Sequence, residues 1–506
     1  MRWNSTSRRL EGPVAVSVAA LSRTAGVALL GAVFAVCLYH VWTLEGRWFV
    51  VTLAGVSLVA VSMVFAGRLS DMMLVVLLFS VPLAGFAKWS FLDEDYYSED
   101  VRSAALYSGT LGLGIVDFVI VGMYLAWAFK IFVAREEPFP RLHKSDAWVA
   151  LVLASYAFSL WGAQFLQLGF YAFQHAIKHA LVYFYVSRHF RREHVPWFVA
   201  AVAVAIVVES AIGVLQYADI VPPGLILDKG AGSERLSEQY RVPGIEDAFR
   251  ATGLTYDSHS LGVYLAMLMP TILLFANYRA VSRRLRLWGL AILGLGLAAL
   301  VVTYSRSAWL AGIISLGIIV LALLAWRERY VIPAMVWAAI ALVVSAPWVF
   351  GQVLKRLIDA PPDLLLVRFD QFPIAWSIWR DHLLFGAGAG NYMERMFQYN
   401  VNWSLPEPVH LVPLFIGAEL GIFGIVAFYG LVLAVCWRLW QCVRRGDDTV
   451  RRLALAVLAG LSAYIFDGMS SPLFREPTVY MMFWIIVAVS AAPVMGARVA
   501  GASGAG

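Results

Sequence analysis

Residues 406–424 read "PEPVHLVPLFIGAELGIFG" and open an apolar run that continues to residue 437. A transmembrane helix needs about 20 mostly apolar residues to cross the hydrocarbon core, and residues 413–437 meet that length. His410 lies in the polar approach to this segment, and Glu419 lies inside the segment. The stretch therefore predicts a chain that enters a membrane from a polar loop.

The same pattern recurs along the whole chain, which has 506 residues, of which 61% are hydrophobic and 14% are charged. Soluble domains are nearer a quarter charged, so the composition excludes an ordinary soluble enzyme. We predict an all-α polytopic membrane bundle of about 14 transmembrane helices. The expected spans are roughly 25–44, 48–67, 72–92, 111–134, 147–167, 170–188, 197–217, 258–278, 287–304, 307–326, 330–350, 413–437, 452–468 and 477–495.

Arginine and lysine gather in alternate connections between these spans, such as "RHFRREH" (188–194) and "YRAVSRRLRL" (278–287). The positive-inside rule places these connections, and both termini, on the cytoplasmic side of a membrane. It also accounts for most of the net charge of +6 without a nucleic-acid partner. Two long polar connections, residues 218–257 and 351–412, then lie on the outer face.

The distribution of spans and loops divides the chain into three parts. We expect residues 1–204 to form the N-terminal transmembrane helices, 205–437 to form a core transmembrane region with the two long loops, and 438–506 to form the C-terminal helices and tail. Within the second loop, Phe372, Trp376 and Trp379 recur at helical spacing. This apolar face predicts a short helix at the membrane surface, so the large loop is expected to carry interfacial helices.

Several polar residues near or inside the spans are candidates for function. Arg250 and Arg368 could hold a phosphate with their five donors, although either could instead anchor to headgroups or lie on a solvated face. His410 could take a proton near neutral pH, or be plain loop surface. Lys178 within a span needs an anionic partner, and Glu209 is the expected one if the pair is only structural.

Two glycine patterns and one histidine pair have structural interpretations. "GAGAGN" (386–391) lacks the flanking strand and helix of a nucleotide site, so we expect a tight turn or close backbone packing. Gly417, Gly421 and Gly424 share one helix face and predict close helix packing. His175 and His179 lie one turn apart without a third ligand, so we expect no metal and no other cofactor.

Five short stretches, taken in order, resemble the bacterial superfamily of O-antigen ligases and of O-antigen and exopolysaccharide polymerases. They are "GVLQY" (213–217), "RATGLTYDSHSLGVYLAMLMP" (250–270), "TYSRSAWLAG" (303–312), "DHLLFGAGAGNY" (381–392) and "VHLVPLFIGAELGIFG" (409–424). The resemblance implies a GT-C-type glycosyltransferase of the bacterial inner membrane, with its active site on the periplasmic face. It would use an undecaprenyl-pyrophosphate-linked glycan as donor and a glycan or lipid-linked acceptor, without a metal. A chain-length regulator is a further possible partner.

The resemblance also assigns roles to particular residues. It implies that His410 is the catalytic base and that Arg250 and Arg368 hold the pyrophosphate. Further substrate contacts are expected from Tyr256, Asp257, His259, Arg306, Arg380, Lys178 and Glu419.

The chain departs from the ligases at two positions of their motifs. Leu411 stands where the ligases have Asn, Ser or Gln, and "DSHS" (257–260) replaces their Pro-Asn. We therefore expect a repeat-unit polymerase of O-antigen or exopolysaccharide. An O-antigen ligase that transfers glycan to lipid A-core is the alternative, and a lipid-linked oligosaccharide transporter is the alternative from another class.

Overall fold

The computed structural model describes residues 69–85, 89–90, 112–222, 249–255, 257–278, 281–328, 363–399, 408–471 and 476–496. This part of the chain is helical apart from one short antiparallel pairing of β1 (Trp89–Ser90) with β2 (Gly112–Leu113). In that pairing Trp89 lies opposite Leu113, and Ser90 lies opposite Gly112. The prediction of an all-α chain is confirmed for the described residues.

The structure describes helices along most of the chain. Their order is α3 (Leu69–Ser80), η1 (Val81–Leu83), α5 (Ile115–Ala128), η3 (Phe129–Val133), α6 (Asp146–Ser159), η4 (Leu160–Gly162), α7 (Leu166–His189), η5 (Arg192–His194), α8 (Val195–Tyr217), α10 (Ser258–Ala276), α11 (Arg283–Val302), α12 (Arg306–Ala325), α14 (Asp363–Asp381), α15 (Tyr392–Met396), η6 (Phe397–Tyr399), α16 (Val412–Arg445), α17 (Asp448–Asp467), α18 (Pro477–Ala491) and η8 (Pro493–Gly496).

Among the described residues, 8 helices are long and apolar enough to cross a membrane. They cover 115–133, 192–217, 258–276, 283–302, 306–325, 412–445, 448–467 and 477–496. The expected spans at 25–44, 48–67 and 330–350 lie outside the described residues, so the count of about 14 stays a prediction. The expected span at 72–92 is too long, because helical structure there ends at Leu83, next to Pro82 and a turn.

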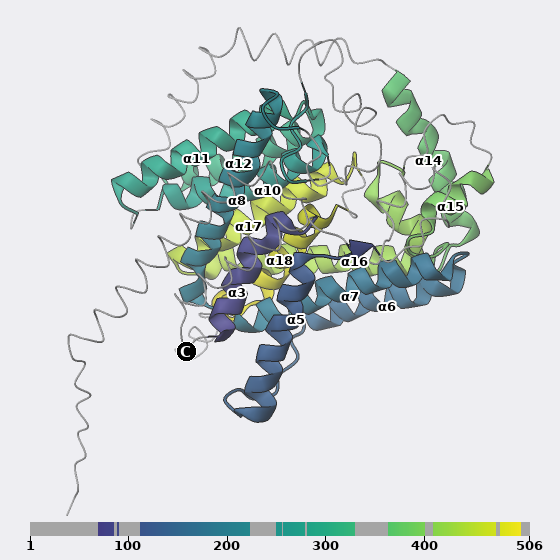
Figure 1. The fold of residues 1–506 in the computed structure, drawn as a ribbon, viewed down its shortest axis with the longest axis horizontal. Helices are drawn as coiled ribbons and strands as arrows, with labels where there is room; N and C mark the ends of the chain where they lie inside the picture. Colours follow the sequence, from purple (N-terminus) through teal and green to yellow (C-terminus); the bar gives the residue numbers. More distant parts are fainter. Residues whose placement is uncertain are drawn as a thin grey trace, which may run out of the picture.

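Helices α10 and α18 lie at the centre of the bundle, where each has 89% of its apolar window buried. Helix α10 packs against α8, α11, α12, α17 and α18. Figure 1 shows α11 and α12 to one side of this centre, and α6, α7 and α16 to the other. Only 28% of α11 and 33% of α12 is buried, so their outward apolar faces suit contact with lipid.

The bundle has two chemically different ends. At one end, here called the outer end, α8, α11 and α17 finish, and α10, α12, α16 and α18 begin. At the opposite, inner end the arginine-rich connections meet, and Arg192 of η5 lies 2.7 Å from Asp447 beside the start of α17. Buried Arg452 pairs there with Glu328. The structure thus gathers the basic segments that the positive-inside rule assigns to the cytoplasm.

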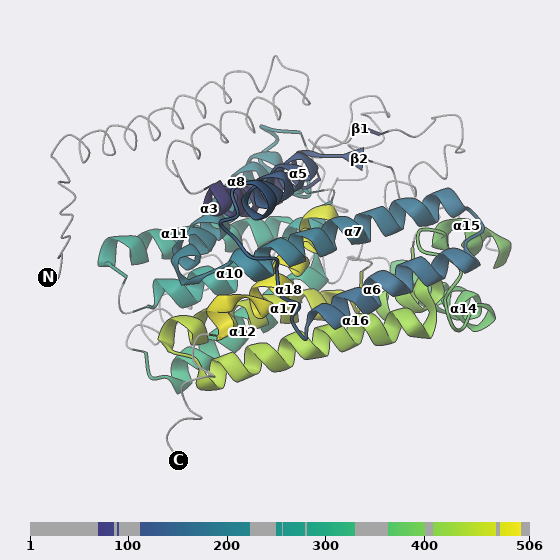
Figure 2. The same ribbon diagram turned by 90° about the horizontal axis from the view of Figure 1, so that it is seen from below.

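Helices α14 and α15 lie at the outer end, beside the ends of α6, α7 and α16, in both Figure 1 and Figure 2. The predicted helix at 367–381 is confirmed as part of α14. Its face with Gln371, Ala375 and Ile378 is fully buried in the bundle, whereas Trp376 is 52% exposed. The predicted contact of the aromatic face with the membrane surface stays a prediction.

Candidate active site at the outer end

Arg250 lies in a short loop that buried side chains of α8 hold in place. The Gln216 side-chain oxygen accepts hydrogen bonds from the backbone N–H groups of Thr252 at 2.9 Å and Gly253 at 2.8 Å. Gly253 has φ +57°, and a Cβ there would come within 2.3 Å of a Glu209 carboxylate oxygen. This contact explains why the close approach of the loop to α8 requires glycine. The "GVLQY" stretch therefore supports the Arg250 loop through its glutamine.

The Arg250 side chain reaches the connection between α11 and α12. Its Nε donates to the Thr303 carbonyl oxygen at 3.2 Å, and the neighbouring Ala251 N–H donates to the Val302 carbonyl oxygen at 3.1 Å. These two bonds attach the loop before α10 to the end of α11. Arg250 is half-buried, so its charge is partly shielded from water.

His259, in the first turn of α10, joins three helices at this end. Its Nε2 lies 2.7 Å from an oxygen of Asp467, the last residue of α17, whose side chain is 0% exposed. Its Nδ1 lies 2.8 Å from the Ser305 hydroxyl and 3.1 Å from the Ser307 hydroxyl, both near the start of α12. A buried carboxylate needs such a partner, because burying an isolated charge is costly.

Arg306 is the first residue of α12 and lies between these two serines in sequence. It is half-buried, and it makes no hydrogen bond or ion pair with any residue that the structure describes. The positive end of the helix dipole disfavours a cation at this position. A guanidinium at the start of α12, at the same end of the bundle as Arg250, suits an anionic ligand.

His410 lies just before α16 and contacts α14 through Gln371. The Gln371 side-chain oxygen lies 3.2 Å from the His410 backbone nitrogen and 3.0 Å from His410 Nδ1. Gln371 is 0% exposed. Helices α14 and α16 can approach closely because Gly417 faces Trp379, where a Cβ would lie 2.6 Å from the indole ring. The packing role predicted for Gly417 is confirmed.

A continuous path of contacts links His410 to the arginines. The Val412 N–H donates to the Gly468 carbonyl oxygen at 2.9 Å, and Gly468 follows Asp467. Asp467 contacts His259, and His259 contacts the serines that flank Arg306. The structure therefore brings His410, His259, Arg306 and Arg250 to the same end of the bundle.

Helix α16 is interrupted close to this site. Gly421 has φ 67° and ψ −167°, a conformation that is essentially restricted to glycine. The carbonyl oxygens freed by the break accept from the "GAGAGN" loop, from Ala387 N–H to Ala418 at 2.8 Å and from Gly388 N–H to Glu419 at 3.2 Å. The expected close packing of this loop is confirmed, whereas the expected continuous glycine face on α16 is wrong at Gly421.

Glu419 is buried below the site and has a structural contact. Its Oε1 accepts from the Tyr392 N–H at 3.3 Å, at the start of α15. The neighbouring Asn391 side chain accepts from the Phe165 N–H at 2.7 Å, which fastens the loop to the start of α7. The bond of Glu419 is thus a buried structural contact, and its expected contact with substrate stays a prediction.

Lys178 is not brought to the outer-end cluster. Its Nζ lies 3.2 Å from an oxygen of Asp117, so its partner is on α5. The expected pairing of Lys178 with Glu209 is wrong, because α7 packs against α5 at this level and Glu209 instead accepts from the Leu254 N–H at 2.7 Å. Lys178 thus has a salt bridge between helices in place of the predicted substrate contact.

Arg380 also lies apart from the cluster, at the exposed end of α14. Its side chain is 67% exposed and lies 3.4 Å from Asp381. The Tyr399 hydroxyl donates to Asp381 at 2.8 Å and lowers the pKa of that carboxyl, and the Arg380 charge lowers it further. This network belongs to the surface of the outer loop.

The structure describes the side chain of one of the three remaining predicted site residues. Asp257 caps α10, because its side chain accepts from the Ser260 N–H at 2.7 Å. This cap fixes the helix end that carries His259. Tyr256 and the side chain of Arg368 lie outside the described residues, although Arg368 itself belongs to α14.

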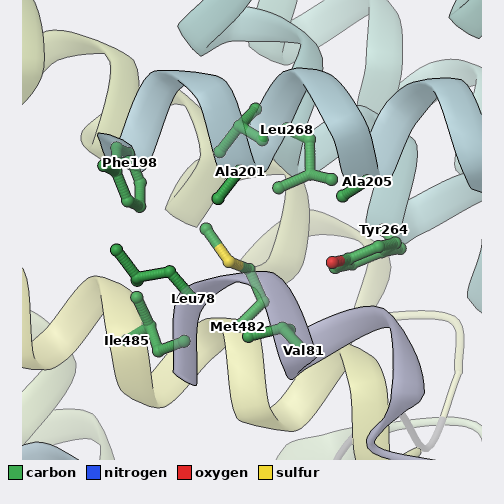
Figure 3. Close-up of a pocket in the computed structure, with 10 residues that line it drawn as sticks. Leu78, Val81, Phe198, Ala201, Ala205, Tyr264, Leu268, Met482 and Ile485 are labelled. Carbon is green, nitrogen blue, oxygen red and sulfur yellow. The ribbon is translucent and has the colours of Figure 1, made fainter. Parts of the chain in front are cut away.

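A small apolar cavity lies between α3, η1, α8, α10 and α18 (Figure 3). Its volume is about 10 Å³, and its lining is apolar apart from the Tyr264 hydroxyl. A cavity of this size holds roughly one water molecule. It is too small for a sugar or a polyprenyl chain, so it is not a substrate site.

One group of side chains has the spacing of metal ligands, at the inner end. It consists of Asp71, Glu193 and His194. The His194 Nδ1 accepts from the Arg191 N–H at 3.0 Å, so in neutral His194 the proton is on Nε2, which faces Asp71 at 3.1 Å. The histidine is therefore engaged as a hydrogen-bonding residue, and no nitrogen lone pair faces a shared ion position.

A comparison with protein families matches residues 291–429 to the O-antigen ligase family. The match confirms the resemblance to the O-antigen ligase and polymerase superfamily, whose members are glycosyltransferase-like membrane proteins. No curated protein matches the chain. The O-antigen ligase-family region contains Arg306, Gln371 and His410, while Arg250, His259 and Asp467 lie outside it.

Sequence reasoning missed four residues of this end of the bundle. Ser305 and Ser307 were present in a quoted motif but were given no role, and Gln371 was placed only within a surface helix. Asp467 had a usable signal, because a carboxylate within a predicted span is a functional candidate by default. The pairing of His259 with Asp467 carried no local signal, since the two residues are far apart in the chain.

Proposed function

We propose that the chain is an inverting glycosyltransferase of the periplasmic membrane face. It would transfer a glycan from undecaprenyl pyrophosphate to a sugar hydroxyl, as a repeat-unit polymerase of O-antigen or exopolysaccharide. The observation that carries the proposal is the gathering of His410, His259, Arg306 and Arg250 at the outer end, opposite the arginine-rich inner end. The O-antigen ligase-family match supports the same class of reaction.

The proposed reaction is a single displacement. His410 takes the proton of the acceptor hydroxyl, and the oxygen attacks the anomeric carbon of the donor sugar. The bond from that carbon to the pyrophosphate oxygen breaks, and undecaprenyl pyrophosphate leaves with the electron pair. One displacement with one base inverts the configuration at the anomeric carbon.

The arginines would stabilise the leaving group. Arg250 and Arg306 present guanidinium groups at the outer end, and Arg368 is assigned to the same role by the family resemblance. Charge-assisted hydrogen bonds from arginine to phosphate are strong, and they gain strength as negative charge grows on the pyrophosphate. In this proposal the guanidinium groups supply the positive charge that a divalent cation would otherwise supply.

The test is glycan synthesis by the purified protein in detergent, with lipid-linked repeat units as the only sugar source. We expect His410→Ala to reduce the rate of glycosidic bond formation by roughly 100- to 10,000-fold, as loss of a general base does. His382→Ala is the matched control, because His382 lies at the same end, and among the described residues its ring bonds only the Ile378 carbonyl oxygen, at 3.1 Å. The control should keep its activity.

Two results would overturn the proposal. Bond formation at the wild-type rate by His410→Ala would remove His410 from the chemistry. Movement of lipid-linked oligosaccharide across reconstituted vesicles, with no new bond, would identify a transporter instead. Substitution of Arg306 by Lys should weaken donor use although the positive charge is kept, since lysine lacks the planar fork.

A second candidate function is O-antigen ligation to lipid A-core, which the description of the matched family favours. Leu411, where ligases have a polar residue, takes the N-cap position of α16 without a side-chain cap and packs on the core. The acceptor decides between the two functions. Supplied with both acceptors, a polymerase lengthens lipid-linked repeat units, with a chain-length regulator as a proposed partner, whereas a ligase glycosylates lipid A-core.

A further inference from the structure

Gln371 makes an unusual double contact with His410. The side-chain oxygen of Gln371 lies 3.2 Å from the His410 backbone nitrogen and 3.0 Å from the His410 ring nitrogen Nδ1. A backbone N–H is always a donor, so the atom that faces it must be the amide oxygen and not the amide nitrogen. The orientation of the glutamine is thereby fixed by the main chain of the residue that it contacts.

The protonation of the imidazole follows from this orientation. An amide oxygen only accepts hydrogen bonds, so Nδ1 of His410 must carry a proton. In the neutral imidazole the lone pair is then on Nε2, which is the nitrogen farther from the main chain. A histidine can take a proton from a hydroxyl only at a nitrogen that carries its lone pair.

Burial strengthens the case for a dedicated role of Gln371. The residue is 0% exposed on the face of α14 that packs inward, beside Ala375 and Ile378. Its amide nitrogen is buried and has no hydrogen-bond partner among the described residues. A leucine of similar size would avoid that penalty, so the amide is costly for packing alone.

We propose that Gln371 is a positioning residue that holds His410 in the Nδ1-protonated tautomer and directs its Nε2 lone pair to the acceptor hydroxyl. The inference rests on the proposed function for its catalytic consequence, but the tautomer itself is a property of the resting protein. Gln371 acts through His410 and does not touch the reacting atoms. Helices α14 and α16 pack against each other and so fix the geometry.

The test uses the full-length protein in detergent and three variants of α14. Gln371→Leu removes the acceptor at nearly constant volume, Gln371→Glu keeps an acceptor oxygen, and Ile378→Val is a control on the same buried face. The nitrogen chemical shifts of ¹⁵N-histidine distinguish the two tautomers, and the His410 signal is assigned as the one that His410→Ala lacks. The second measurement is the pH dependence of glycan synthesis.

We expect the Nδ1-protonated form in the wild type and in Ile378→Val, and a mixture of tautomers in Gln371→Leu. Gln371→Leu should lose on the order of 10- to 100-fold in rate, as loss of a residue that orients a base does. Gln371→Glu should keep the tautomer and retain activity. Its rate should rise toward a plateau at higher pH than in the wild type, because a carboxylate stabilises the protonated imidazole.

Different results separate the two proposals. An unchanged His410 tautomer in Gln371→Leu, or an Nε2-protonated wild type, overturns the role of Gln371. A tautomer that changes as expected while the rate stays at the wild-type level upholds the role of Gln371 and overturns His410 as the base. If Gln371→Leu fails to fold, a loss of the Nδ1-protonated form in Gln371→Glu would overturn the inference.

Discussion

The contact between His259 and Asp467 shows how single residues hold the outer end together. Asp467 is fully buried at the end of α17, where the negative end of the helix dipole disfavours a carboxylate. Its partner belongs to α10, and the serines bonded to that histidine belong to α12. The arrangement ties three helices beside Arg306, so its loss should affect stability as well as activity.

We predict that Asp467→Ala lowers the free energy of unfolding by about 3 kcal/mol, because it removes one partner of a buried charged pair. Denaturant unfolding in detergent measures the change. The double variant with His259→Ala should lose much less than the sum of the single losses, since the two changes remove one shared contact. Strictly additive losses would show that the two residues do not interact.

Asp381→Ala on α14 serves as the control for that measurement. Its side chain is 43% exposed, and that of its partner Arg380 is 67% exposed. Exposed ion pairs contribute little, so this substitution should leave the free energy of unfolding almost unchanged. A comparable loss in both variants would point to a general sensitivity of the bundle to the loss of a carboxylate.

At the scale of elements, the break in α16 decides the shape of the outer end. A straight helix through residues 412–445 would leave the "GAGAGN" loop without acceptors for its backbone N–H groups. The break supplies the Ala418 and Glu419 carbonyl oxygens, and Ile422 and Phe423 donate in return to the carbonyl oxygens of residues 383 and 384. Buried backbone N–H and C=O groups without a partner cost free energy. The conformation of the "GAGAGN" loop and the break in α16 therefore depend on each other.

Gly421→Ala tests this dependence. The substitution forces a side chain into a positive-φ conformation, and its Cβ would lie 2.3 Å from the Leu384 carbonyl oxygen. We predict a loss of roughly 3 kcal/mol or more in the free energy of unfolding, measured by denaturant titration in detergent.

Gly317→Ala on α12 provides the contrast, because a Cβ there meets nothing within 4 Å. It should be neutral or stabilising by up to about 1 kcal/mol through helix propensity. A Gly421→Ala protein as stable as Gly317→Ala would mean that α16 can straighten without cost.

At the scale of the whole molecule, the distribution of charge sets the expected orientation in the membrane. The inner end collects arginines from η5, α11, α16 and α17, while the outer end collects the candidate site. We predict that two residues, exposed to nearly the same degree, lie on opposite sides of the membrane. Trp161 near the outer end is 84% exposed, and Leu142 near the inner end is 83% exposed.

In a variant without the native cysteines, a membrane-impermeant maleimide added from the periplasmic side should label Trp161→Cys in intact cells. It should label Leu142→Cys only after the inner membrane is broken. Because both positions are equally exposed, a difference in labelling reports the side of the membrane and not burial. Labelling of Leu142→Cys alone would reverse the orientation and place the candidate site in the cytoplasm.

The site also shows where sequence reasoning reaches its limit. The order of the motifs pointed to Arg250, Arg306, His259 and His410, and the structure places all four at one end. The partner of Lys178 was misassigned, because two carboxylates within spans are equivalent in sequence and only packing separates Asp117 from Glu209. The buried face of α14 was not predicted, because its glutamine stands out less in sequence than the three aromatic residues that share another face.

The sequence by itself determined that the chain is helical and apolar enough for a membrane, and which end of each helix carries positive charge. Those properties are local, because length and hydropathy decide whether a helix can span the bilayer. Only the tertiary structure decided that Gln371 contacts His410, that Asp467 contacts His259, and that α16 breaks at Gly421. The two contacts join residues far apart in the chain, and a rotation of one helix by a single residue would have separated each pair. The break at Gly421 likewise depends on the loop that packs against it.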